Sequence, residues 1–135
     1  MRIVHIETQV GNLQGRDAIY LDSVDYQPVD KVLKLIGEIN LNLSSEGNSD
    51  DFAPYVLEFR GIHSYSQVHL DVWIRNNEDC FMGSSFYEVL DDEEAAKASI
   101  IKGEPFKKFI VQTYDHVFEI ISINFQMSME MNIFS

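Results

Sequence analysis

Residues 107–131 of the chain read KKFIVQTYDHVFEIISINFQMSMEM, and this stretch decides the fold. Aromatic and β-branched residues, which favour pleated strands, fill 109–114 and again 117–121. Asp115 and His116 separate the two runs, and both residue types tolerate turns. We therefore expect an antiparallel hairpin with these two residues at its tip.

The faces of this hairpin follow from the same pairing. Thr113 would oppose Phe118 and Val111 would oppose Ile120, which makes one face mostly apolar. We expect that face to lie against the core.

A further strand is expected at the end of the stretch, because residues 125–131 alternate apolar and polar side chains. Its apolar positions are odd-numbered, whereas Phe118 and Ile120 are even. A bulge or turn between Ser122 and Asn124 would correct this difference, since one extra residue reverses the facing of a strand. We then expect Phe118, Ile120, Phe125 and Met127 to face one core.

The rest of the chain is also rich in strand patterns. Strands are expected at 2–8, 18–21, 38–43, 55–60 and 67–74, and turns or loops at 22–28 and 44–54. The runs 55–60 and 67–74 are expected to pair as a hairpin. Residues 31–36 fit either a strand or a helix, and we favour a strand.

One helix is expected over residues 91–102. Asp91 or Asp92 can cap its start, acids occupy its first turn, and Gly103 and Pro105 end it. The predicted fold is therefore β-rich (all-β to α+β): an antiparallel sandwich or bent sheet with a C-terminal hairpin, formed by a single domain over 1–135.

Charge narrows the possible partners. The chain has 135 residues with 10 Lys plus Arg and 22 Asp plus Glu, a formal net charge of −12. Such a chain is repelled by phosphate backbones and anionic lipids, so nucleic acid and membranes are not expected partners. The charge serves solubility, or it forms an acidic face for a basic protein.

The expected location is the cytoplasm. The chain has one cysteine, Cys80, which fits a reducing compartment. No apolar run at the N-terminus has the length of a signal peptide, and no stretch approaches the ~20 apolar residues of a membrane span.

The candidate ligand-binding residues are His69, Asp71 and Trp73. In a strand over 67–74 the twofold period would place them on one face. With His63 or Glu58 they could hold a metal, although no familiar zinc spacing is present, and we predict neither a metal nor a cofactor. The alternative is an ordinary polar face.

Other reactive residues have simpler interpretations. Asp115 and His116 are adjacent in a turn, where neighbouring side chains often point apart. Cys80 lacks an evident basic partner and is interpreted as a buried or half-buried thiol. Met127, Met129 and Met131 form a stripe that fits the core, or else an adaptable binding surface. No nucleotide-binding or hydrolase motif is present.

Three classes of function remain. We expect a non-enzymatic protein-interaction module, similar in charge and size to inhibitor or immunity proteins. The alternative is a small-ligand or metal-binding protein, or an enzyme, that uses the His69, Asp71 and Trp73 face. A structural subunit that pairs through a sheet edge or an exposed apolar patch is a third possibility, and the oligomeric state is open.

Overall fold

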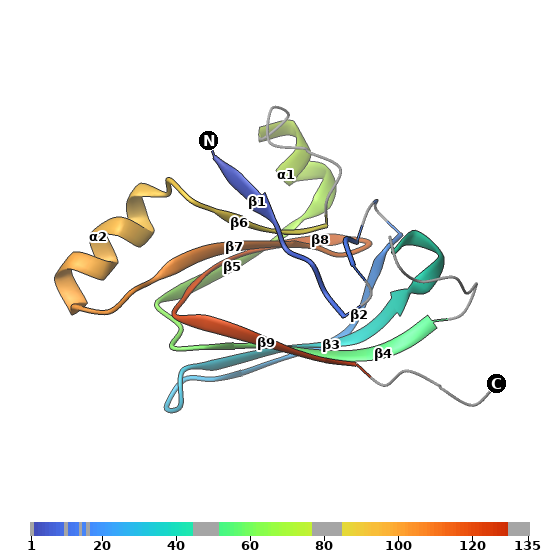
Figure 1. The fold of residues 1–135 in the computed structure, drawn as a ribbon, viewed down its shortest axis with the longest axis horizontal. Coiled ribbons are helices and arrows are strands. Elements are labelled where there is room, and N and C mark those ends of the chain that lie inside the picture. Colours follow the sequence, from blue (N-terminus) through green and yellow to red (C-terminus); the bar gives the residue numbers. More distant parts are fainter. Residues whose placement is uncertain are drawn as a thin grey trace.

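The computed structural model describes residues 2–9, 11–13, 15, 17–44, 52–76 and 85–129, with the backbone alone at 74–76, and it contains two antiparallel sheets (Figure 1). The first sheet has the strand order β1 (Ile3–His5), β6 (Phe86–Val89), β7 (Lys107–Gln112), β8 (His116–Ser122) and β5 (Ser64–His69). The second has the order β2 (Ile19–Gln27), β3 (Val32–Asn40), β4 (Phe52–Arg60) and β9 (Asn124–Met129). The β-rich, sandwich-like fold predicted from the sequence is confirmed.

Phenylalanines fill the space between the two sheets. The ring centroids of Phe86 and Phe125 lie 5.1 Å apart, those of Phe109 and Phe125 5.3 Å, and those of Phe59 and Phe109 5.5 Å. These contacts are edge-on or tilted, the geometry that aromatic rings prefer. The main core therefore contains an aromatic cluster from strands of both sheets, surrounded by buried aliphatic side chains.

The outer face of the five-stranded sheet carries two smaller apolar clusters. One contains Leu70 and Trp73 of α1 (Leu70–Asn76), packed with Ile110 and Val117. The other contains two alanines of α2 (Glu93–Lys102) together with Phe106 and Ile121. Figure 1 shows α2 at one end of the molecule. Both helices thus cover this sheet.

The two sheets are joined at a corner by two strands that bend together. β4 continues through Gly61 into β5, and β8 continues through Ile123 into β9. On either side of the bend the same two segments pair, β4 with β9 and β5 with β8. Gly61 has a φ of 67°, and a Cβ there would lie 2.6 Å from the Ile123 side chain, so only glycine fits.

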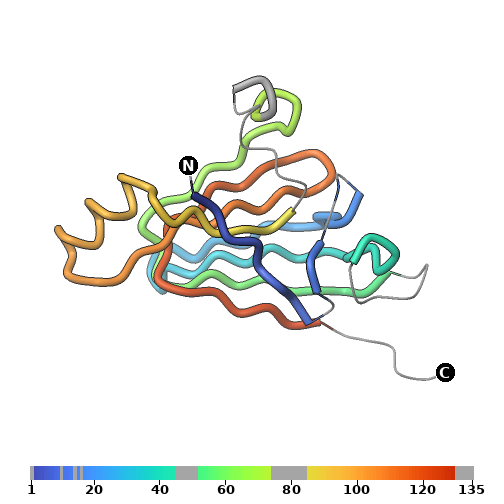
Figure 2. The backbone as a smooth tube through the Cα atoms, turned by 45° about the horizontal axis from the view of Figure 1, so that its top comes forward, coloured from blue at the N-terminus to red at the C-terminus, as the bar shows by residue number. Residues whose placement is uncertain are grey.

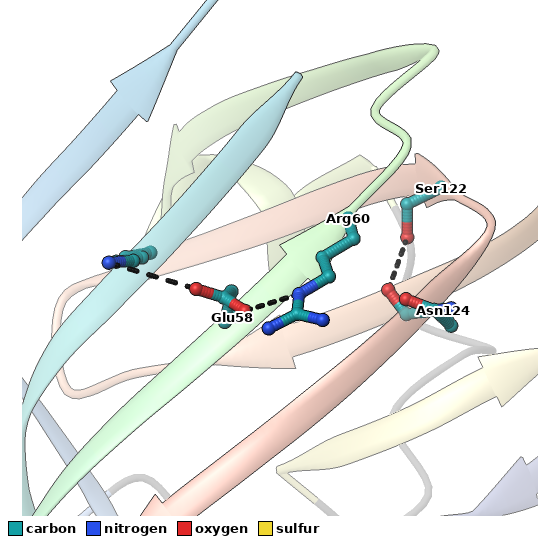
Figure 3. Close-up of polar contacts among 5 residues, drawn as sticks. Glu58, Arg60, Ser122 and Asn124 are labelled. Atoms are coloured by element: carbon teal, nitrogen blue, oxygen red, sulfur yellow. Dashed lines mark hydrogen bonds and ion pairs between the residues drawn. The ribbon is translucent and has the colours of Figure 1, made fainter. Parts of the chain in front are cut away.

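Backbone hydrogen bonds continue through the corner. The amide of His63 donates to the carbonyl of Ile121 at 2.8 Å, and the amide of Ile123 donates to the carbonyl of Arg60 at 3.1 Å. Figure 3 shows this bend, with the Ser122 hydroxyl donating to the carbonyl oxygen of Asn124 at 3.4 Å. The corner therefore keeps its backbone groups paired while the chain changes sheets.

The N-terminal segment crosses the opposite side of the molecule, from β1 toward β9 (Figure 2). The amide of Ile6 donates to the carbonyl of Phe86 at 3.1 Å, and Nε2 of Gln9 reaches the carbonyl of Met127 at 3.5 Å. The edge strands β2 and β5 lie on the other side, where the rings of Tyr26 and Tyr65 meet edge-on at 5.0 Å.

The C-terminal hairpin pairs as expected, but its tip is displaced by one residue. Thr113 pairs with His116, because its amide donates to the His116 carbonyl at 2.8 Å. The turn is therefore Tyr114–Asp115, and the prediction of Asp115–His116 is wrong. Val111 now opposes Phe118, a shift of two positions that leaves every facing unchanged.

The break after β8 is confirmed. Ile123 separates β8 from β9, and Phe118 and Ile120 belong to the main core, against which Phe125 and Met127 pack. Met129 packs there too, whereas Met131 lies outside the described residues.

The helix prediction for 91–102 is also confirmed. The carboxylate of Asp92 accepts from the amide of Ala95 at 2.9 Å and caps α2. Gly103 ends the helix in the left-handed conformation at φ 69°. The strand favoured for 31–36 is likewise present, as part of β3.

Other boundaries differ from the prediction. β2 extends through most of the expected turn at 22–28, because a bulge between Leu21 and Ser23 accommodates Asp22. β4 begins at Phe52, inside the expected loop at 44–54. Residues 41–43 form a 3₁₀ turn instead of a strand, since the Asn40 side chain accepts from the Asn42 amide.

The strand expected at 67–74 is wrong in its second half. β5 ends at His69, opposite His116, where the partner strand begins at the tip of its hairpin. With no further partner the chain forms α1, and the amide of Leu70 donates to the Asp115 carbonyl at 2.8 Å. The expected 55–60/67–74 hairpin is also wrong, because β4 and β5 belong to different sheets.

Candidate functional site

The predicted site residues His69, Asp71 and Trp73 do not share a strand face. His69 is the last residue of β5, whereas Asp71 and Trp73 belong to α1. Helical spacing places Trp73 and Leu70 on the same side of α1, in the apolar cluster that they form on the outer face of the five-stranded sheet. Trp73 is 5% exposed there. The prediction that the three side chains share one strand face is therefore wrong. The indole of Trp73 is buried in this cluster and does not lie on the surface beside His69 and Asp71.

His69 keeps a local contact with Asp71 and gains an unexpected neighbour. Nδ1 of His69 lies 3.9 Å from a carboxylate oxygen of Asp71 and accepts from the Asp71 amide at 3.3 Å. Across the sheet, the His69 ring meets that of His116 edge-on, with centroids 5.9 Å apart. The pattern of residues 67–74 could not indicate this pair, because it depends on the register of β5 with β8.

The residues considered as additional metal ligands lie elsewhere. Glu58 is on the four-stranded sheet, where Lys34 lies 3.7 Å away and Arg60 donates to the same carboxylate (Figure 3). His63 packs on the ring of Phe106 at 5.4 Å. Within the described ranges no group of three or more His, Cys, Asp or Glu could hold a metal, and Cys80 lies outside them.

A pocket of about 350 Å³ lies between β2 and the tip of the β7–β8 hairpin, and we call it the tip pocket. It is lined by Tyr20, Leu21, Asp22, Ser23, Val24, Gln67, Thr113, Tyr114, Asp115 and His116. Its volume is at the lower end of the range for small-ligand sites. The residues come from three segments that are far apart in the sequence: 20–24, 67 and 113–116.

Two stacked tyrosines form one part of the tip pocket. The rings of Tyr20 and Tyr114 lie 5.4 Å apart and 14° from parallel, and Phe52 meets Tyr20 edge-on at 5.6 Å. The amide of Tyr114 donates to the carbonyl of Ile19 at 2.9 Å, which fixes the hairpin tip against β2. Tyr114 is nevertheless 40% exposed.

The electrostatic environment of this pair is acidic. Partial burial, then the Asp17 carboxylate and Tyr114, raise the pKa of the Tyr20 hydroxyl above its ordinary value. Asp22 and Asp115 belong to the lining of the pocket, and both residues are exposed. No lysine or arginine is among the lining residues that the structure describes.

The β2 bulge explains how Asp22 comes to lie there. Leu21 pairs with Gly37, and a Cβ on Gly37 would lie 1.9 Å from the carbonyl oxygen of Tyr20. That oxygen accepts the Tyr55 hydroxyl at 3.0 Å. The bare backbone of Gly37 thus lets β2 approach closely, and the register shift that follows inserts Asp22.

Two further pockets lack, in their described lining, the combination of aromatic, acidic and imidazole groups that lines the tip pocket. One of about 400 Å³ lies on the outer face of the four-stranded sheet, over Ile36, Pro54 and Val56. Another, of about 220 Å³, includes Lys108 and Glu119.

Lys108, in the pocket of about 220 Å³, is held by two carboxylates. Nζ of Lys108 lies 3.3 Å from Asp92 and 3.4 Å from Glu119. Desolvation lowers the pKa of Lys108, but the Glu119 and Asp92 carboxylates outweigh it, and the net shift is upward. This charge therefore anchors α2 to the sheet. The tip pocket is the one that combines aromatic, acidic and imidazole groups.

Two findings concern the chain as a whole. Among the helices described, none is long and apolar enough to cross a membrane. Comparison of the chain with protein families, with curated proteins and with solved structures found no match.

Proposed function

We propose that this chain is a non-enzymatic protein-interaction module that docks the end bearing the tip pocket onto a basic protein. The observation that carries the proposal is the composition of that pocket: its described lining has two tyrosines and two aspartates, and no lysine or arginine. Tyrosine is enriched at the centres of protein interfaces, and complementary charge speeds and orients association.

The end of the molecule opposite the tip pocket provides a control surface. α2 and the β2–β3 turn lie at the end opposite the β7–β8 turn (Figure 1). Acids and lysines are mixed there: Lys97 and Lys102 of α2 accompany Glu93 and Glu94, and Lys31 follows Asp30 in the turn. Loss of a basic partner through the tip pocket alone would therefore separate a local docking surface from the general acidity of the chain.

The proposal also covers location and excluded partners. A net charge of −12 opposes binding to nucleic acid and anionic lipid. A single cysteine fits the reducing cytoplasm, where we place the protein.

The test is a capture experiment with the full chain as bait in native lysate at low and at 0.3 M salt, the second about twice physiological ionic strength. The variant D22N/D115N removes two charges from the tip pocket. The control D30N/E104Q removes two exposed charges from the opposite end. We expect a salt-sensitive basic partner that is lost with the first variant and retained with the second. Capture of salt-insensitive partners alone, or equal loss with both variants, would refute the proposal.

The alternative, a small-ligand site or enzyme based on His69, Asp71 and Trp73, has weaker support. A stacking role needs an accessible indole, and Trp73 is packed in the outer cluster. His69 and Asp71 remain exposed, but two polar residues without the ring do not form a pocket of their own.

A further inference from the structure

We propose that the tip pocket receives an arginine side chain of the partner, with its guanidinium against Tyr114 and paired with Asp22. This inference rests on the proposed function and specifies what that surface recognises.

Shape and rings favour a long, planar cation. A pocket of about 350 Å³ between β2 and the hairpin tip can admit one extended side chain. The parallel Tyr20–Tyr114 stack presents an aromatic surface, and Tyr114 is 40% exposed. A guanidinium is planar and stacks on tyrosine, whereas an ammonium is a compact, strongly hydrated charge.

Charge and hydrogen-bonding groups favour the same ligand. The Asp22 carboxylate can accept two parallel N–H bonds from a guanidinium, a geometry that an ammonium cannot match. Gln67 and Ser23 also line the pocket and supply further acceptor oxygens. The described residues that line the pocket include no lysine or arginine, so a guanidinium from a partner would bring the opposite charge to this carboxylate.

The position of Asp22 makes the site specific to this fold. Asp22 occupies the bulge that Gly37 permits on an edge strand, and edge strands commonly carry charges of this kind only to prevent aggregation. A purely protective aspartate needs no aromatic neighbours. Here the bulge lies in the lining of a pocket that the hairpin tip also lines. The backbone of that tip is hydrogen-bonded to Ile19 at the start of β2.

The test uses N-acetyl-arginine amide as the probe, titrated into the isotope-labelled full chain and followed by amide chemical shifts. N-acetyl-lysine amide and N-acetyl-citrulline amide are the matched probes, since citrulline keeps the shape and loses the charge. We expect saturable shifts confined to residues 20–24 and 113–116. Arginine should bind about threefold or more tightly than lysine, because only the guanidinium stacks and pairs with two bonds.

Variants locate the site independently. Asp22→Asn should weaken arginine binding roughly tenfold, the effect of losing a charged hydrogen-bond partner. Tyr114→Leu should reduce the preference for arginine over lysine while keeping the bulk of the tip. Asp30→Asn should change neither. The spectrum of each free variant reports whether it is folded, and the probe comparison on the natural chain requires no variant at all.

The results separate this inference from the function on which it rests. If citrulline binds as well as arginine, or lysine equals arginine, or the shifts scatter over the surface, the arginine pocket is refuted. The proposed function would survive if D22N/D115N still abolished capture of a salt-sensitive partner. Failure of the capture experiment together with selective arginine binding would instead leave the pocket and refute the docking role.

Discussion

At the scale of single residues, Tyr55 shows how one hydroxyl stabilises the bulge beside the tip pocket. The residue is 2% exposed, and its hydroxyl donates to the carbonyl of Tyr20 at 3.0 Å. Burial, and then the Asp22 carboxylate, raise the pKa of Tyr55 above its ordinary value of 10.0. The hydroxyl therefore stays neutral in the folded chain under conditions in which it ionises in the unfolded chain.

Tyr55→Phe should lower stability at pH 7 by about 0.5–1.5 kcal/mol, because the Tyr20 carbonyl loses its bond. Since the pKa of Tyr55 is higher when folded, its contribution is complete below about pH 10 and is lost as pH rises toward the folded pKa. Phenylalanine does not ionise, so the variant does not lose stability in this way. The difference in free energy of unfolding between the natural chain and Tyr55→Phe should therefore shrink by roughly 1 kcal/mol at pH 11. Urea unfolding at both pH values measures it, and a constant difference would contradict the prediction.

At the scale of elements, the C-terminal stretch was predictable and residues 67–74 were only half predictable. The facings of β7, β8 and β9 follow from alternation within the sequence, and a break at Ile123 follows from the change of parity. The pattern of 67–74 fits a strand throughout, but a strand also needs a partner. β8 provides one only as far as His116, and that limit depends on the hairpin tip.

The candidate site was less predictable than the fold for the same reason. Tyr20 and Tyr114 are 94 positions apart, and they stack only because the hairpin tip bonds to the start of β2. The tip was recognised as a turn, but its displacement by one residue moved Tyr114 from the strand into it. The signal that could have indicated the site was Gly37, a glycine inside an otherwise alternating strand, which commonly marks a bulge opposite.

The same elements give a stability prediction. Phe118 is fully buried in the main core, so Phe118→Ala should cost about 3–5 kcal/mol. Gln126 and Ser128 alternate with core residues on β9 and are exposed, so either one changed to Ala should cost within about 0.5 kcal/mol. Urea unfolding of the three variants compares them directly. A Gln126→Ala cost near that of Phe118→Ala would mean that the outer face of β9 is covered.

At the scale of the whole molecule, a net charge of −12 opposes folding through mutual repulsion of the acids. Screening should relieve this repulsion. We expect the melting temperature to rise by roughly 2–5 °C between 0.02 and 0.3 M salt, as the Debye length shortens. Sodium chloride and choline chloride should act alike, because screening does not depend on the cation. A rise with sodium alone would indicate a bound ion instead.

Repulsion between acidic side chains should destabilise the proposed binding end more than the opposite end. Binding surfaces commonly retain residues that reduce stability, because function selects them. Asp22 and Asp115 line the same pocket, whereas Asp30 lies in a turn next to Lys31. Neutralising Asp22 therefore removes repulsion, and neutralising Asp30 removes attraction.

Asp22→Asn should raise the melting temperature at low salt by about 1–3 °C, and Asp30→Asn should leave it unchanged or lower it slightly. At 0.3 M salt the difference between the two variants should fall, because exposed charges are then screened from one another. Thermal unfolding at both salt concentrations tests this. If Asp22→Asn instead destabilised the protein at every salt concentration, the carboxylate would be holding the bulge together, and its presence in the pocket would be explained by folding without any partner.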